Sequence, residues 1–485
     1  MNNILSILRP ALTCIVSFLG LFQVSAQDPI SGSLISAPAL RGALVSAVLI
    51  DLETGEELSS HRPTDRLCPA SVWKLLTCTA ALESLGPDFN FRTLLAYRGD
   101  IIQDTLHGDL IVLGGGDPSL ASSYFQPDLD QLLSSWATAI RAKGIAVVRG
   151  DIRAYTGHFE GDGIPGTRVW EDMANYYGAA VYGLNVYDNS YSIHFDTGTE
   201  AGVLTRITAI RPEVPELSLS NEVLSARGGG DQAYIFGAPG TTRRSIRGTL
   251  PMGHKDFAIR GSLPDPPQFL LHHLHRHMAA QGIAIDGKPI IESNEIPEPA
   301  TLRLILEHRS PPLKDLVRHT LVKSDNLFAE TLLRQLGHLQ GSSSLNGALE
   351  ALRNHFAWMD AEGGRAFFAY DGSGLSRFTS ISARSLAALM HRAYSDDVLR
   401  PYMLEALPKA GQEGTMKYFV RGTSLEGQAK IKSGSMDGVR AIAGHFESAG
   451  GRQLACVLMV NAYEGSSTEV RKAMEGYLLE AYRHY

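Results

Sequence analysis

Apolar residues follow two different periods along this chain, and each period predicts its own kind of element. The apolar run Leu44–Asp51 leads into Leu-Glu-Thr-Gly, which predicts a strand followed by a hairpin turn. The segment after Pro69 is rich in helix formers, so we expect a helix that begins near this proline and ends near Gly86. The N-terminal part of the chain therefore mixes strand and helix.

From about residue 301 the helical period returns, and alternation follows it. The helical period predicts helices in the segments Leu313–Leu321, Asn326–Leu336, Gly347–Phe356 and Ser385–Tyr394. Alternating residues predict strands at Ala429–Lys432, Arg440–Phe446 and Gln453–Val460, and the apolar spacing of Thr468–Tyr485 predicts a last helix. Helices and strands thus occupy both ends of the chain.

The middle of the chain, from about residue 91 to 300, differs in composition and in its pattern of apolar residues. Short alternating runs lie among many Gly, Pro, Asp and Tyr residues, which predicts β-rich inserted modules. Within it, Leu271–Met278 is rich in histidine, but no acidic residue or cysteine stands beside these histidines. This favours a solvated helix face over a metal site, and we expect neither a metal nor another cofactor.

The first 26 residues differ from the rest of the chain. They carry a single charge, Arg9, then the apolar stretch Ala11–Phe22 and the small residues Val24-Ser25-Ala26. This order is typical of a secretory signal peptide cleaved after Ala26. A membrane anchor is the alternative, but the apolar stretch is shorter than the roughly 20 residues that span a bilayer.

Composition and charge narrow the class of protein. The 485 residues are 44% hydrophobic and 20% charged, which is typical of a folded chain of two to four domains. A formal net charge of −7 excludes a basic surface for nucleic acid, and the lack of a second long apolar run excludes a polytopic membrane protein. Once Cys14 is removed with the signal peptide, we interpret Cys68, Cys78 and Cys456 as small core residues.

Ser71 and Lys74 form the first candidate for catalysis. They lie three residues apart at a predicted helix start, so both side chains share one helix face. A serine hydroxyl needs an adjacent base to become a nucleophile, and a lysine becomes that base where burial lowers its pKa. The apolar neighbours of Lys74 indicate a buried helix, so this Ser-x-x-Lys is a minimal device for acyl transfer.

Two later segments supply further polar groups. Ser324 and Asn326 stand in a predicted helical stretch and offer a hydroxyl and an amide to one cleft. A predicted strand ends in Lys432-Ser433-Gly434-Ser435. At a strand edge, a lysine and a hydroxyl can bind a carboxylate, and Gly434 lets a substrate backbone approach closely.

In this order, Ser-x-x-Lys, Ser-x-Asn and Lys-Ser/Thr-Gly are the signature of the penicillin-recognising serine acyltransferases, which the sequence resembles. It is similar in particular to the low-molecular-mass class C penicillin-binding proteins, the D-alanyl-D-alanine carboxypeptidase/endopeptidase family of the penicillin-binding protein 4 type. The segments that carry this closer resemblance are 115–120, 170–173, 177–179 and 371–377, together with a long insertion after the Ser-x-x-Lys helix.

The resemblance implies a role for each motif residue. Ser71 would be the acylated nucleophile and Lys74 its general base, while Ser324 would relay a proton to the leaving group. Asn326 would hold the peptide backbone, and Lys432 would tune the site electrostatically. The hydroxyl of Ser433, where the family often has Thr, would bind the terminal carboxylate.

Other positions would recognise the substrate. By the same resemblance, the backbone N–H groups of Ser71 and Ser435 would form the oxyanion hole. Asp172 and Tyr177 match positions that recognise the free amino end of the stem-peptide side chain, and Met436 would line the same pocket.

The resemblance also implies an α+β fold. We expect a serine β-lactamase/transpeptidase-like domain, an antiparallel sheet flanked by helices, that two nested β-rich inserted domains split. The expected division is a signal peptide at 1–26, the catalytic domain at 27–92 and 301–485, one inserted domain at 93–116 and 199–300, and a second at 117–198.

The implied protein is an exported serine D-Ala-D-Ala carboxypeptidase, and also a candidate DD-endopeptidase, of the periplasm or the cell-envelope exterior. Its partners would be peptidoglycan stem peptides, and β-lactam antibiotics would inhibit it covalently. Nucleic acid is not expected, nor is a transmembrane span after signal removal.

Two alternatives stay open. A serine β-lactamase or esterase of the same fold would use Tyr-x-Asn, and Tyr187-Asp188-Asn189 matches that pattern inside the predicted insertion. A non-catalytic cell-wall binding protein would have kept the fold alone, although no catalytic position is missing. The sequence has neither a Gly-x-Ser-x-Gly elbow nor His-Glu-x-x-His, so other serine and zinc hydrolases have no support.

Overall fold

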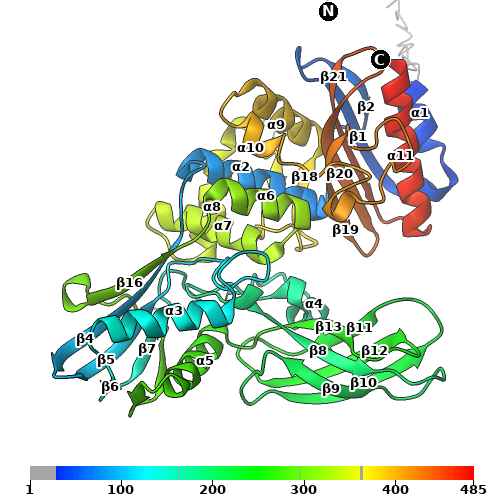
Figure 1. Cartoon of the computed structure of the whole chain (residues 1–485). Coiled ribbons are helices and arrows are strands. Elements are labelled where there is room, and N and C mark those ends of the chain that lie inside the picture. The colour runs from blue at the N-terminus through cyan, green and yellow to red at the C-terminus, as the bar shows by residue number, and fades with distance from the viewer. Residues whose placement is uncertain (1–28, 162, 294, 361–363) are drawn as a thin grey trace, which may run out of the picture.

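The computed structural model describes residues 29–485 apart from 162, 294 and 361–363, so the predicted signal peptide lies outside the described residues. A five-stranded antiparallel sheet in the order β19-β20-β21-β1-β2 joins the two ends of the chain (Figure 1). Its strands are β1 (Leu44–Asp51), β2 (Glu57–His61), β19 (Lys430–Met436), β20 (Val439–Glu447) and β21 (Gln453–Asn461). The predicted hairpin after Asp51 is confirmed by the antiparallel pairing of β1 with β2.

Helices cover both faces of this sheet. On one face, α11 (Ser467–His484) packs on β20 and on α1 (Pro29–Ile35). On the other face, α9 (Ala383–Ser395) packs on β1 and β21. This arrangement confirms the predicted α+β fold, an antiparallel sheet flanked by helices.

A helical layer packs beside the sheet and follows the predicted helices closely. Its members are α2 (Lys74–Leu85), α6 (Leu313–Lys323), α7 (Asn326–Leu339), α8 (Leu345–His355) and α10 (Arg400–Met403). Every residue of α7 from Leu327 to Gly337 is buried, so this helix forms the centre of the layer. A small sheet of β3 (Arg66–Leu67), β17 (Phe367–Phe368) and β18 (Ser380–Ser382) lies next to it.

The insert leaves the helical layer on β4 and returns on β16, which pair with each other (Figure 1). Its first sheet is mixed and contains β4 (Arg92–Ile102), β5 (Thr105–Leu113), β6 (Val147–Val148), β7 (Ile152–Tyr155), β14 (Ala284–Ile285), β15 (Pro289–Glu292) and β16 (Arg303–Arg309). The helices α3 (Leu129–Ala142) and α5 (Pro266–Ala280) pack against each other and on this sheet.

Two three-stranded sheets complete the insert. One contains β8 (Ser190–Asp196), β9 (Arg206–Arg211) and β13 (Phe257–Ser262), and the other β10 (Ser218–Ala226), β11 (Gln232–Phe236) and β12 (Arg243–Pro251). Strand pairing crosses both expected boundaries. Across the boundary at 117, β6 and β7 pair with β5, and across the boundary at 198, β8 pairs with β9 and β13. The division of the insert into domains stays a prediction.

Three local expectations need correction. The helix after Pro69 begins as a 3-10 turn, η2 (Ala70–Trp73), and α2 starts only at Lys74. Ser324 stands between α6 and α7 in a left-handed conformation, with a φ of 60°, rather than inside a helix. The Lys432–Ser435 motif lies within β19, which continues to Met436, because β20 pairs with this segment to its end.

The remaining expectations concern surfaces and thiols. Across the described residues, no helix is long and apolar enough to cross a membrane. Cys78 and Cys456 are buried free thiols, and Cys68 is a half-buried one. The histidine-rich segment lies in α5 as predicted, and no three His, Cys, Asp or Glu side chains of the described ranges gather as a metal site would require.

Candidate active site

Ser71 is presented by the short η2 turn, against which β19 packs. Ala70, just before it, is buried with a φ of 45°, so the chain makes a sharp left-handed turn into Ser71. Gly434 of β19 is a glycine for a steric reason: a Cβ there would lie 2.3 Å from the carbonyl oxygen of Pro69 and 2.9 Å from the backbone nitrogen of Ser71. The close approach of strand and turn therefore depends on Gly434.

Lys74 lies one helical turn after Ser71 and is completely buried. Its Nζ is 2.9 Å from the Oγ of Ser71 and 2.6 Å from the Oδ1 of Asn326, and it also donates to the carbonyl of Ser373 at 2.8 Å. Burial lowers the pKa of Lys74 to about 8, although nearby carboxylates, foremost that of Asp371, act in the opposite direction. The amine is thus suited to take a proton from the Ser71 hydroxyl near neutral pH.

A second serine–lysine pair faces the first. Lys432 Nζ donates to Ser324 Oγ at 2.8 Å and to the carbonyl of Ser433 at 2.6 Å. Burial, together with the charge of Lys74, holds the pKa of Lys432 well below its usual range. Asn326 links this region to the insert, because its Nδ2 donates to the carbonyl of Tyr177 at 2.7 Å.

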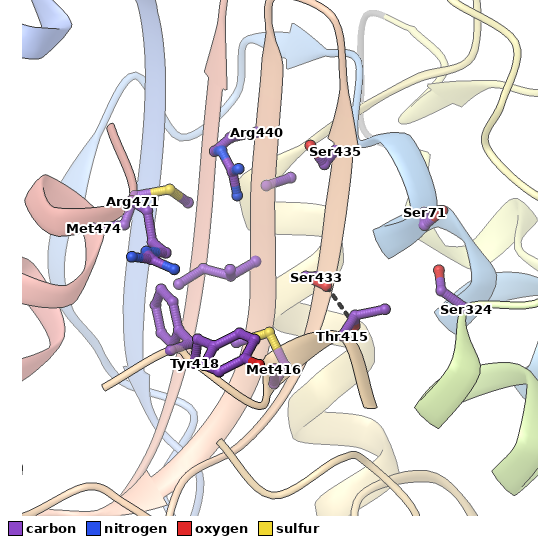
Figure 2. A pocket seen from close by; sticks show the side chains of 13 residues that line it. Ser71, Ser324, Thr415, Met416, Tyr418, Ser433, Ser435, Arg440, Arg471 and Met474 are labelled. Atoms are coloured by element: carbon purple, nitrogen blue, oxygen red, sulfur yellow. Dashed lines mark hydrogen bonds between the residues drawn. The ribbon is translucent and has the colours of Figure 1, made fainter. Parts of the chain in front are cut away.

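One cavity opens on the Ser433 side of Ser71, and we call it the basic cavity (Figure 2). It has a volume of about 350 Å³ and is lined by Ser71, Ser324, Thr415, Met416, Tyr418, Phe419, Ser433, Ser435, Arg440, Ala441, Ile442, Arg471 and Met474. Figure 2 shows Ser71 and Ser324 at one end, Arg440 and Arg471 at the other, and Ser433 between them. The Oγ of Ser433 is 2.8 Å from the Oγ1 of Thr415, so these two hydroxyls form one polar group in the wall.

A second cavity of about 460 Å³, the acidic cavity, opens on the other side of Ser71. Its lining is Ser71, Val169, Glu171, Asp172, Tyr177, Tyr234, Ser324, Asn326, Gly374, Leu375, Arg377, Ser435, Met436 and Asp437. Three carboxylates thus face one guanidinium. Burial raises the pKa of Asp172 and, with the charge of Asp172 beside it, raises the pKa of Tyr177.

The structure brings all of the predicted site residues together. Ser71, Ser324 and Ser435 line both cavities, and Asn326, Asp172, Tyr177 and Met436 line the acidic one. Lys74, Lys432 and Gly434 lie behind this surface, and Ser433 lines the basic cavity. Tyr187, the alternative Tyr-x-Asn residue, lines neither of these two cavities in the described part of the chain.

A buried carboxylate, Glu330, supports the site and escaped the motif analysis. It accepts hydrogen bonds from the backbone N–H of Gly372 at 2.9 Å and from the hydroxyl of Ser373 at 2.6 Å, and it pairs with Arg168 of the insert at 3.2 Å. Burial raises the pKa of Glu330, and the neighbouring Asp371 acts in the same direction. A charged residue among the apolar residues of α7 is the one signal in the sequence that points to it.

Comparison with known proteins places this chain in a family. The family model "D-Ala-D-Ala carboxypeptidase 3 (S13) family" matches residues 27–481. A D-alanyl-D-alanine carboxypeptidase of Actinomadura sp. strain R39 is 27% identical over 454 residues, which cover 89% of this chain and 80% of that relative.

Solved structures agree on the fold. Penicillin-binding protein 4 (dacB) of Haemophilus influenzae superposes with a TM-score of 0.80 at 23% identity, over 94% of this chain and 98% of that one. The same Haemophilus protein complexed with a β-lactam gives a TM-score of 0.75 at 22% identity, over 94% of this chain and 100% of that one. The resemblance to class C penicillin-binding proteins is confirmed, and the chain belongs to the D-Ala-D-Ala carboxypeptidase 3 (S13) family of serine-type carboxypeptidases.

Proposed function

We propose that this protein is an exported serine D-Ala-D-Ala carboxypeptidase that acts on peptidoglycan stem peptides through an acyl-enzyme on Ser71. The observation that carries the proposal is the 2.9 Å contact between the Ser71 hydroxyl and the buried amine of Lys74, at the junction of two cavities. A buried amine with a lowered pKa beside a hydroxyl is the arrangement that activates a serine nucleophile.

The first half of the reaction forms an ester. The Oγ of Ser71 bonds to the carbonyl carbon between the two D-alanines, and its proton passes to neutral Lys74 Nζ. The backbone N–H groups of Ser71 and Ser435 stabilise the negative charge on the carbonyl oxygen. The C–N bond then breaks, and the leaving amine receives the proton from Lys74 by way of Ser324, which Lys432 Nζ holds in place.

The second half restores the enzyme. Water attacks the ester carbonyl and gives one proton to neutral Lys74. The bond between the carbonyl carbon and Ser71 Oγ breaks, Lys74 returns the proton to Oγ, and the shortened peptide leaves as a carboxylic acid. A β-lactam would open its ring on Ser71 to form the same kind of ester. The Haemophilus neighbour solved with a β-lactam supports this part of the proposal.

The two cavities suit the two ends of the substrate. The hydroxyl of Ser433 would donate a hydrogen bond to the terminal carboxylate, beside the buried Nζ of Lys432. Asp172 and Tyr177, with Met436 beside them, would receive a free amino group in the acidic cavity. An enzyme that trims cell-wall peptides acts outside the cytoplasm, which agrees with the signal peptide predicted for residues 1–26.

The activity is tested with purified protein that starts at residue 27. We expect release of D-alanine from a pentapeptide that ends in D-Ala-D-Ala, and we expect prior exposure to penicillin to block it. Absence of release under conditions where the protein is folded would refute the proposal. Rapid turnover of a chromogenic cephalosporin would support the β-lactamase alternative instead.

The proposed base makes acylation dependent on pH. Because the pKa of Lys74 is about 8, the amine is mostly protonated below that pH and accepts no proton. The second-order rate constant for labelling by a fluorescent penicillin should rise about tenfold per pH unit below pH 8 and level off above it. Circular dichroism over the same range controls for unfolding, and a rate that stays flat from about pH 6 to 9 would exclude Lys74 as the base.

A further inference from the structure

We propose that the insert has a carbohydrate-binding face beside the acidic cavity, and that this face holds the glycan chain to which the acylated stem peptide is attached. We call it the sugar face. It is the solvent side of the sheet β10-β12-β11, together with Trp170 of α4 (Trp170–Met173) at the edge of that sheet. The inference rests on the proposed function and adds to it a binding site for the polymer that carries the substrate.

Side-chain alternation separates the two sides of this sheet. On one side, Val223, Ile235 and Ile246 are fully buried in the core of the insert. The other side presents Ser220, Glu222 and Leu224 of β10, Ser245, Arg247 and Thr249 of β12, and Gln232, Tyr234 and Phe236 of β11. The exposure of Glu222, Arg247 and Tyr234 shows that this side is open to a ligand.

Aromatic rings gather at the β11 edge of the sugar face. Trp170 is 55% exposed, and its ring centroid lies 6.4 Å from that of Phe236. The guanidinium of Arg247 lies over the Phe236 ring, 5.6 Å from its centroid, and Tyr234 is exposed on the same strand as Phe236. Apolar side chains that gather in solvent with polar groups around them are typical of a binding site.

The segment that contains Trp170 is fixed to the sheet. The short helix α4 packs on β11, which is the edge strand (Figure 1). The side chain of Asn175 takes the place of a neighbouring strand there. Its Nδ2 donates to the carbonyl of Ile235 at 3.2 Å, and its Oδ1 accepts from the N–H of Ile235 at 3.1 Å. The sugar face is therefore preformed, which reduces the entropy lost when a ligand binds.

The sugar face continues from the acidic cavity. Val169 and Glu171, which flank Trp170 in the sequence, line that cavity, and so does Tyr234. In the proposed function this cavity receives a side-chain amine of the stem peptide, and the stem peptide is joined at its start to a sugar polymer. The polymer therefore lies beyond the acidic cavity, where the face that begins at Tyr234 is available to it.

The chemistry of the face suits a chain of pyranose rings. Such a ring presents C–H groups on its faces, which pack on aromatic rings, and hydroxyls at its edge, which exchange hydrogen bonds with hydroxyl and amide groups. Ser245, Thr249 and Gln232 supply these groups beside the aromatic rings. The charged residues of the face, Arg247 and Glu222, lie 3.4 Å apart and offset each other, so a neutral polymer suits the face better than an anionic one.

The binding test uses a probe that takes no part in the reaction. Peptide-free glycan strands of several disaccharides are titrated by calorimetry into protein whose Ser71 has been acylated with penicillin. We expect saturable binding that Trp170→Ala weakens about fivefold, because one stacked ring is lost. Trp358→Ala is the matched control, since Trp358 in η6 (Ala357–Met359) is also 45% exposed and has Arg392 5.1 Å above its ring. It should leave the affinity unchanged.

The kinetic test compares two substrates. Values of kcat/KM for D-alanine release are measured with a free pentapeptide and with the same pentapeptide attached to a glycan strand. The wild type should prefer the attached substrate, and Trp170→Ala should lower the ratio of attached to free about fivefold. Arg247→Gln tests the same face from β12 without altering α4, whose Asp172 lines the acidic cavity, and it should lower the ratio as well. Loss of its exposed pair with Glu222 has little effect on stability.

The outcomes separate this inference from the proposed function. Ratios within twofold of the wild-type value in both Trp170→Ala and Arg247→Gln would overturn the sugar face, and so would an equal loss in Trp358→Ala. Wild-type protein that releases D-alanine from the free pentapeptide but does not bind peptide-free glycan would overturn it while the proposed function stands. If the wild type acts on neither substrate and penicillin does not label it, the proposed function itself fails, and the role of the face in this reaction fails with it.

Discussion

Replacing Ser71 with alanine should abolish covalent labelling by a fluorescent penicillin and lower D-alanine release at least about a thousandfold. The reason is the loss of the Oγ that forms the ester, while Lys74 and both cavities stay in place. The cavities contain a second serine hydroxyl that contacts a lysine amine. Ser324 Oγ lies 2.8 Å from Lys432 Nζ, just as Ser71 Oγ lies 2.9 Å from Lys74 Nζ. Geometry at the hydroxyl alone therefore does not distinguish the two serines.

Their surroundings do distinguish them, and Ser324→Ala is the matched control. Ser71 stands in the η2 turn against β19, and its backbone nitrogen lies close to Gly434, where an oxyanion site would form. We expect Ser324→Ala to slow turnover but to keep the penicillin adduct, located on Ser71 by peptide mass mapping. An adduct on Ser324, or undiminished labelling of Ser71→Ala, would overturn the assignment of the nucleophile.

Much of the fold can be predicted from the sequence because its elements bury continuous faces. The apolar spacing predicts α6 to α9, β1, β20, β21 and α11, each of which packs one or both faces into a core. The insert is harder to predict, since β5 pairs in parallel with β7 and β7 with β15, far along the chain. Pairings between distant segments leave no local pattern in the sequence. The domain boundaries expected at 117 and 198 therefore do not coincide with the strand pairing.

The site divides in the same way. The contact between Ser71 and Lys74 can be predicted from the sequence, because one helical turn brings residues three positions apart together. Contacts between distant segments have no such signal. Arg168 and Glu330 are 162 positions apart, and the two arginines of the basic cavity come from different elements, β20 and α11.

The buried pair of Arg168 and Glu330 leads to the second large effect. The side chains are 2% and 4% exposed, and the pair ties the insert to α7 and to the loop whose Ser373 carbonyl accepts a hydrogen bond from Lys74. Glu330→Gln keeps the volume and the acceptor but removes the negative charge. We expect the free energy of unfolding to fall by about 3–5 kcal/mol, because a guanidinium does not lose its proton and stays charged without a partner.

The reverse change should cost less. When Arg168→Met removes the guanidinium, Glu330 is able to take up a proton, and burial already raises its pKa. Urea unfolding of both single variants and of the double variant measures this asymmetry, and the double variant should be more stable than Glu330→Gln alone. Penicillin acylation should slow in Glu330→Gln as the Ser373 carbonyl shifts from Lys74. A Glu330→Gln protein within about 1 kcal/mol of the wild type, or an Arg168→Met protein that is the less stable of the two, would show that the pair does not hold the insert against the active site.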